Sequence, residues 1–327
     1  MPRASRPGEF ALIEQYFRPL AAGASALSLG DDAALLSPRA GEDLVLTTDT
    51  IAAGVHFFPD DPPESIARKA LRVNLSDLAA KGAAPVGYLM ALALPADWTE
   101  PWMRRFCASL ADDQRAYGIG LIGGDTIRAS GGLTITITAI GSVPKGAMVK
   151  RSGARPGDII FVSGTIGDSA LGLRLRRGDI VGKGQGARFL LGRYLHPEPR
   201  TALAPVLRRY ASAAMDVSDG LVGDLAHICE VSGVGAEVRG DRVPLSDAAR
   251  AMVTASSVGL GDLLNGGEDF EILTTVPPAD GRRFAAAAKR AGVAVTGIGR
   301  VTVGKGPPKV RDADGRPIAV GTSHAHF

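Results

Sequence analysis

The 327-residue sequence contains only 2 cysteines, and 5% of its residues are aromatic. Cys107 and Cys229 form no CxxC pair, which argues against the common zinc and dithiol redox motifs. Both lie in segments with helical patterns, where a buried apolar role is the ordinary one. No uncharged stretch approaches membrane-spanning length, and the first residues lack the apolar core of a secretion signal. We therefore expect a cytoplasmic protein in a reducing compartment, with no membrane partner.

An excess of one charge is also lacking. The 37 basic and 34 acidic residues give a formal net charge of +3, and the basic residues are scattered in short pairs. Without a long basic stripe or an aromatic and basic platform, nucleic acid is not an expected partner. The hydrophobic content of 45% instead predicts a globular protein that is long enough for two ordinary domains.

Two familiar nucleotide motifs lack their required context. Gly118, Gly120 and Gly123 match GxGxxG, but they follow a predicted helix and precede a predicted strand, whereas a dinucleotide fingerprint requires the reverse order. Lys183 is followed by Gly184 and not by a hydroxyl residue, so it is not the lysine of a P-loop. A nucleotide must therefore be bound in another way.

Hydrophobic periodicity predicts an α/β protein with mixed sheets. A glycine-rich and basic segment at 146–157 has no apolar period, and we place a domain boundary there, between residues 1–147 and 148–327. In the first domain we expect helices at 10–20, 65–81 and 100–117, and strands at 43–50, 87–94 and 133–140. In the second we expect strands at 158–162, 214–217, 270–276 and 293–301, and helices at 168–177, 187–195, 199–210, 219–231 and 279–291. Asn74 and Asp77 are expected on the polar face of their helix, opposite its apolar stripe.

Six short acidic motifs are distributed along the chain, and each places a carboxylate beside a glycine, a small residue or a hydroxyl residue. They are GDDAA, TTDT, NLSD, GGDT, MDVSDGL and NGGEDFE. Mg²⁺ prefers carboxylate oxygen and is usually completed by water and substrate phosphate. The pattern predicts that several Mg²⁺ ions are held around one cavity by Asp32, Asp49, Asp77, Asp125, Asp216 and Asp219.

Each acid also has an ordinary structural explanation of about equal weight. These are a turn after glycine for Asp31, Asp32 and Asp125, an i+4 ion pair with Lys81 for Asp77, and a helix N-cap for Asp216 or Asp219, with Ser218 as a rival cap. Such roles do not explain why threonines flank the acid in TTDT. Taken together, the motifs favour metal binding.

A bare acidic cluster repels phosphate, so the hypothesis requires intervening cations. Arg151 is either an additional organic cation or a surface arginine. His56 is either a satisfied core histidine or a substrate contact. Glu268 and Asp269 follow two glycines, and one of them is a candidate ligand for a cationic or amino-bearing ring.

The motifs together resemble the thiamine-monophosphate kinase family over nearly the whole chain. The matching segments are GEF, GDDAALL, TTDT, GVHF, KALRVNLSDLAAKGA, LIGGDT, KRSGARPGD, SGTIGDSALGL, MDVSDGL and NGGEDFE. The resemblance implies the two-domain fold of the aminoimidazole ribonucleotide synthetase superfamily, with an N-terminal ATP- and metal-binding domain that forms a barrel across a homodimer. It also implies ATP-dependent phosphorylation of thiamine monophosphate to thiamine diphosphate.

The resemblance also implies roles for individual residues. The magnesium ligands are Asp32, Thr47, Thr48, Asp49, Asp77, Asp125, Asp216 and Asp219; the ATP contacts are Tyr117, Gly124, Asp125, Arg151 and Ser218; the thiamine monophosphate contacts are His56, Glu268 and His324. The ending SHAHF is a departure, because His324 stands where the family has an aromatic residue.

The implied chemistry needs no general base, because the acceptor phosphate has a second pKa of about 6 and is already ionised. Catalysis then consists of alignment and charge neutralisation around Asp49, Asp77, Asp125 and Arg151, with direct in-line transfer. Aminoimidazole ribonucleotide synthetase is the enzymatic alternative, and a sensor of nucleotide or thiamine phosphate is the non-enzymatic one. Selenophosphate synthetase and the hydrogenase-maturation relative are disfavoured, because they require cysteines near the N-terminus and at the C-terminus respectively, where this chain has none.

Overall fold

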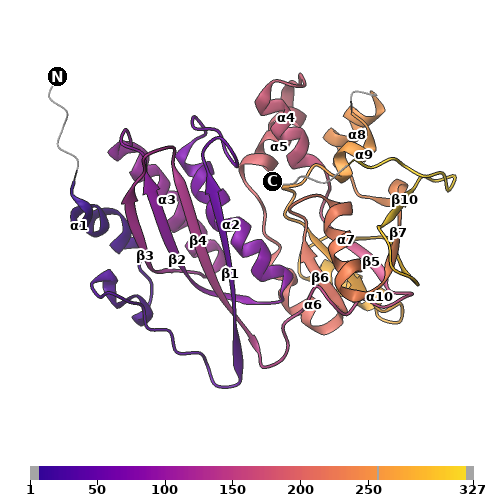
Figure 1. Ribbon diagram of the computed structural model, residues 1–327, viewed down its shortest axis with the longest axis horizontal. Coiled ribbons are helices and arrows are strands. Elements are labelled where there is room, and N and C mark those ends of the chain that lie inside the picture. Colours follow the sequence, from indigo (N-terminus) through magenta and orange to yellow (C-terminus); the bar gives the residue numbers. More distant parts are fainter. Residues whose placement is uncertain (1–6, 256–257, 322–327) are drawn as a thin grey trace. The chain divides into compact units, whose positions relative to one another are not determined.

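The computed structural model describes residues 7–255 and 258–321. The chain forms two compact units (Figure 1). The first contains the described residues up to Leu75 together with Ala84–Lys145, and the second contains Ser76–Ala83 and the described residues from Gly146 onward. Each unit has its own mixed sheet, which confirms the predicted α/β class.

The first unit is built on a four-stranded sheet in the order β1-β4-β2-β3. Its strands are β1 (Glu42–Ala52), β2 (Ala84–Leu94), β3 (Leu121–Arg128) and β4 (Thr134–Pro144). β4 is antiparallel to both neighbours, and β2 and β3 are parallel. Strict alternation in β4 sends Ile135 and Ile137 to a buried face, and Thr136 and Thr138 to the opposite, more open face.

Helices cover the buried face of this sheet. Helix α3 (Glu100–Tyr117) lies behind the sheet in Figure 1, and α2 spans Pro63–Ala80. Thr99 caps α3 by accepting from the Trp102 N–H, and Gly118 ends the helix with φ +65°. The N-terminal segment is less regular: α1 (Glu9–Leu12), a π-helical turn η1 (Ile13–Phe17), and 3-10 turns η2 (Arg18–Leu20) and η3 (Ala24–Leu29).

The second unit contains a six-stranded sheet in the order β10-β7-β9-β5-β8-β6. The strands are β5 (Ile159–Ser163), β6 (Ala213–Asp216), β7 (Gly235–Arg239), β8 (Ile272–Val276), β9 (Val295–Thr302) and β10 (Lys309–Arg311). β10 pairs in parallel with β7, and every other pairing is antiparallel.

The alternation of β5 explains why helices pack on both faces of this sheet. Ile160 and Val162 share one core with α7 (Leu221–Ser232), whereas Phe161 belongs to a second core with α6 (Ala204–Tyr210) and α10 (Gly281–Arg290). The result is a three-layered arrangement. A separate small core unites four helices: α4 (Asp168–Arg177), α5 (Gly184–Leu195), α8 (Asp247–Thr254) and α9 (Leu260–Leu264).

Two local expectations were wrong, and one strand was missed. The segment 10–20 is not one regular helix; Pro19 has no N–H to donate, and the chain changes helix type before it. The region 121–128 is a strand that the glycine-rich sequence did not suggest. Asn74 is fully buried and not on a polar face; its Nδ2 donates to the Ala70 carbonyl at 3.1 Å. In the part of the chain that the structure describes, no helix combines the length and apolarity needed to cross a membrane.

Candidate active site

Three of the predicted residues line one cavity of the first unit, with a volume of about 890 Å³. Asp32 precedes the sheet, whereas Gly124 and Asp125 lie on β3. A Cβ on Gly124 would lie 2.0 Å from the Met90 carbonyl oxygen, so only glycine permits this approach of β3 to β2. The Asp125 carboxylate accepts the N–H of Thr126 at 2.8 Å, which leaves its other oxygen for further interaction.

The TTDT motif lies at the other edge of the same sheet. Across the intervening strands β4 and β2, the register aligns Asp49 with Gly124, the neighbour of Asp125 on β3. At standard strand spacing, Asp49 and Asp125 are therefore roughly 14 Å apart. Because side chains alternate along a strand, Thr47 and Asp49 share a face and Thr48 points to the opposite one. The Thr48 hydroxyl is 3.0 Å from the Thr138 hydroxyl. One unit therefore does not bring Asp49 and Asp125 to a single ion.

His56 and Tyr117 both contact their own unit. The Nδ1 atom of His56 accepts the Ala52 N–H at 3.2 Å, which leaves the proton of a neutral ring on Nε2. The His56 carbonyl accepts from the Lys69 amine at 3.0 Å. Tyr117 ends α3, and the Arg72 guanidinium lies 5.6 Å from its ring centroid. Neither His56 nor Tyr117 is among the residues that line the cavity.

The second unit contains its own acidic group. Asp216 ends β6 and is 5% exposed, and Asp77 lies on the last turn of α2, which belongs to this unit. Burial, followed by the charge of Asp77, raises the pKa of Asp216, whereas Ser76 and Lys81 act in the opposite direction. A buried acid whose pKa is raised in part by a neighbouring carboxylate is a candidate functional residue, and such a pair suits a cation.

Asp224 belongs to the same group, although the sequence analysis did not select it. It is fully buried at the start of α7, and its Oδ2 accepts the N–H groups of Ser218 and Asp219 at 2.9 and 3.1 Å. Its Oδ1 is buried and has no hydrogen-bond partner among the residues that the structure describes. Burial, then the charge of Asp219, raises the pKa of Asp224 to about 7. The available signal was an acid in the first turn of a helix directly after the MDVSDGL motif.

The NGGEDFE motif is a strained loop fixed to the MDVSDGL motif. Glu268 and Phe270 have φ values of +58° and +51°, which are unusual for residues with side chains. The N–H of Glu268 donates to the Ser218 carbonyl at 2.7 Å, and that of Phe270 donates to the Val217 carbonyl at 2.8 Å. Strain of this kind persists only where the surroundings impose it, and it is common at functional sites. The loop therefore positions Glu268 directly beside Ser218.

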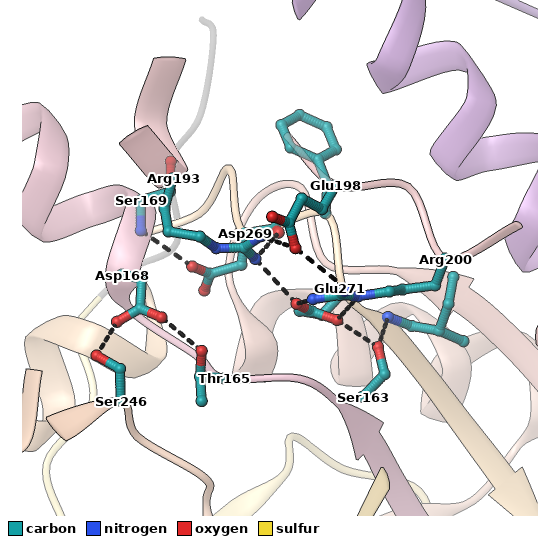
Figure 2. A network of polar contacts seen from close by, with 12 residues as sticks. Ser163, Thr165, Asp168, Ser169, Arg193, Glu198, Arg200, Ser246, Asp269 and Glu271 are labelled. Carbon is teal, nitrogen blue, oxygen red and sulfur yellow. Dashed lines mark hydrogen bonds and ion pairs between the residues drawn. The ribbon is translucent and has the colours of Figure 1, made fainter. Parts of the chain in front are cut away.

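A buried polar network imposes this loop conformation, and Figure 2 shows two guanidinium groups converging on Glu271. Glu271 is fully buried; it accepts from Arg193 at 2.9 Å, from Arg200 at 2.7 Å and from the Ser163 hydroxyl at 2.5 Å. Asp269 accepts the Gly167 N–H at 2.8 Å, at the start of α4. Asp269 and Glu271 therefore hold the loop in place.

The donor set fits Mg²⁺ without forming a complete cage. Among the described residues, no group of three or more His, Cys, Asp or Glu side chains is close enough to hold an ion alone. Mg²⁺ is usually bound by one or two carboxylates, with waters and substrate phosphates completing the octahedron. The Asp77 and Asp216 carboxylates, with the orphaned oxygen of Asp224, provide that chemistry. His324 lies outside the described residues.

Comparison with known proteins identifies the family. Residues 30–143 match the model for the AIR synthase related protein, N-terminal domain, and residues 155–308 match the model for its C-terminal domain. The thiamine-monophosphate kinase of Caulobacter vibrioides is 44% identical over 309 residues, 93% of this chain and 87% of that protein. The chain belongs to the thiamine-monophosphate kinase family. The predicted resemblance is thereby confirmed.

Solved structures of this kinase family share the fold. The crystal structure of thiamine-monophosphate kinase from Stenotrophomonas maltophilia superposes with a TM-score of 0.83 at 40% identity, covering 95% of this chain and 98% of the other. AaThiL complexed with AMPPCP and TMP gives a TM-score of 0.79 at 32% identity, with 99% of each chain covered. Both units therefore share the architecture of this kinase family, of which AaThiL has been crystallised with AMPPCP and TMP.

Proposed function

We propose that this protein transfers the γ-phosphoryl group of ATP to thiamine monophosphate and releases ADP and thiamine diphosphate. The observation that carries the proposal is similarity over 99% of the chain to a kinase crystallised with TMP and with AMPPCP, an ATP analogue. The acidic motifs support a site for metal-bound polyphosphate rather than for an uncharged substrate.

Mg²⁺ is part of the proposal. The residues proposed to hold several ions are Asp32, Thr47, Thr48, Asp49, Asp77, Asp125, Asp216 and Asp219. When bound, the ions supply charge neutralisation between donor and acceptor phosphates. The burial of Asp216 and the orphaned oxygen of Asp224 support a cation on the second unit.

The remaining residues bind and orient the substrates. We assign ATP to Tyr117, Gly124, Asp125, Arg151 and Ser218, and thiamine monophosphate to His56, Glu268 and His324. Arg151 offsets the charge on the transferred group, and transfer is direct because an ionised acceptor phosphate requires no base and no phosphorylated enzyme. The carboxylate of Glu268 suits the cationic ring system of the acceptor, in a loop that is already rigid.

The test incubates purified protein with ATP, Mg²⁺ and thiamine monophosphate and follows thiamine diphosphate by mass. Asp49→Asn removes a proposed ligand from β1, and Asp43→Asn makes the same change on the same strand as the matched control. We expect product from the wild type and the control, and at least a hundredfold less from Asp49→Asn, on the order of a lost charge-stabilising contact. A phosphorylated residue after incubation with ATP alone would contradict direct transfer, and absence of product would favour the synthetase or sensor alternative.

We also propose a cytoplasmic homodimer that pairs through the sheet of the first unit. The open face of this sheet carries exposed apolar side chains at Leu46, Leu89 and Ile127, with exposures of 62, 36 and 57%. Several exposed apolar side chains on one sheet face are typical of an interface. Light scattering of Leu46→Glu tests the proposal: the expected result is a monomer, and an unchanged dimer would place the interface elsewhere.

A further inference from the structure

Lys81 is a cation built into the acidic group of the second unit. Its amine donates to the carbonyl of Ala214 at 2.9 Å, and Ala214 lies two residues before Asp216 on β6. Its own N–H donates to the Asp77 carbonyl at 3.0 Å, one helical turn earlier. The Lys81 amine is thus held beside β6, the strand that carries Asp216, by a hydrogen bond to a backbone carbonyl.

The segment that carries Arg151 packs against Lys81 and Ala214. The Val149 N–H donates to the Lys81 carbonyl at 3.1 Å, and the Lys150 carbonyl accepts from the Ala214 N–H at 3.0 Å. Lys81 thus lies close enough to feel the charges of Asp216, Asp77 and Arg151, and the balance of burial and these charges lowers its pKa below the ordinary value. Burial and the nearby arginine lower the pKa of Lys81, whereas the two acids raise it.

We propose that the Lys81 ammonium is a resident counter-cation of Asp77 and Asp216 and that it weakens their affinity for divalent metal in the absence of nucleotide. This inference rests on the proposed metal role of these acids. Two carboxylates near a low-dielectric interior repel each other, and a fixed positive charge offsets that repulsion. An arriving divalent ion meets the same positive charge, so its binding is disfavoured until substrate phosphates add negative charge. Lys81 thereby couples metal binding to nucleotide binding.

The test measures Mn²⁺ binding by calorimetry, with neither ATP nor thiamine monophosphate present. Lys81→Met removes the charge and the hydrogen bond. Lys81→Gln removes the charge but keeps an N–H donor for Ala214, so it separates electrostatics from the structural tie. Lys289→Met removes an exposed lysine from α10 of the same unit and is the matched control. We expect both Lys81 variants to bind Mn²⁺ roughly tenfold more tightly than the wild type, and the control to bind as the wild type does.

A second readout uses thermal unfolding with and without Mn²⁺. The Lys81 variants are expected to melt lower than the wild type without metal and to gain more from its addition, because a tighter ligand stabilises more. Unchanged affinity in both variants, or tighter binding by Lys289→Met as well, overturns the inference. Failure of every form to bind Mn²⁺ overturns it together with the metal role. If the Lys81 variants bind Mn²⁺ more tightly but the wild type yields no thiamine diphosphate, the counter-cation role of Lys81 is supported and the proposed kinase activity is rejected.

Discussion

Replacing Glu271 by glutamine tests whether the buried network stabilises the second unit. The Glu271 side chain is fully buried, and its partners Arg193 and Arg200 have side chains that are 7 and 22% exposed. The amide keeps an acceptor oxygen, and among the described residues the remaining carboxylate in an ion pair with these two guanidinium groups is that of Glu198, which is 55% exposed. Removing one partner of a buried ion pair costs about 3–5 kcal/mol. We expect a loss of about 3 kcal/mol, at the lower end, because Glu198 compensates in part.

The matched control is Glu237→Gln, which makes the same change in the same unit on a solvent-exposed pair. Glu237 and Arg311 are 46 and 37% exposed, so this change is expected to cost roughly 0.5 kcal/mol. Urea unfolding should be followed by far-UV circular dichroism, because both tryptophans, Trp98 and Trp102, lie in the first unit. If Glu271→Gln lowers the free energy of unfolding no more than Glu237→Gln does, the reasoning that burial makes this network stabilising is refuted.

Three further predictions concern local geometry. Gly124→Ala is expected to abolish soluble folded protein, since its Cβ meets the Met90 carbonyl at 2.0 Å; a wild-type melting temperature would contradict this. At position 268 φ is +58°, so the Glu268→Gly variant should be about 1 kcal/mol more stable than the Glu268→Ala variant. Both variants should have a higher KM for thiamine monophosphate than the wild type. Equal stabilities of the two variants would show that the loop carries no strain. Burial raises the pKa of Cys107 to about 12 and that of Cys229 to about 11. At pH 8, iodoacetamide should therefore modify the native protein far more slowly than the urea-unfolded protein, and the native rate should rise with pH as thiolate forms. Equal rates of modification, measured by mass, would contradict the burial.

The sequence predicted those elements whose local signals agree with their burial. The helices expected at 100–117 and 168–177 have the expected bounds, because both end at a glycine with positive φ, Gly118 and Gly178. Strand β3 was missed because its glycines suggest a turn, whereas their actual reason is close contact with β2. The region 235–264 gave no prediction, and it contains β7, α8 and α9, short elements stabilised by packing with distant segments.

The chemistry of the site was more predictable than its geometry. Acidic motifs indicated carboxylates for metal and phosphate, but sequence spacing does not determine which strand edge each acid occupies, so the separation of Asp49 from Asp125 was not foreseen. Asp224 and Lys81 were not selected as site residues, because an acid in a first turn and a lysine after a helix are ordinary surface patterns. Only the fold shows that the first is fully buried and that the amine of the second reaches β6.

The backbone link between MDVSDGL and NGGEDFE has a consequence for how such sequences diverge. Val217 and Ser218 exchange hydrogen bonds with Glu268, Phe270 and Glu271, so neither segment has an independent conformation. Substitutions in the two motifs should therefore be non-additive, as expected for residues in direct contact. A change that is neutral in one relative can be damaging in another whose partner motif differs. The two motifs are therefore expected to evolve together as one structural element, although they lie about 50 residues apart in the sequence.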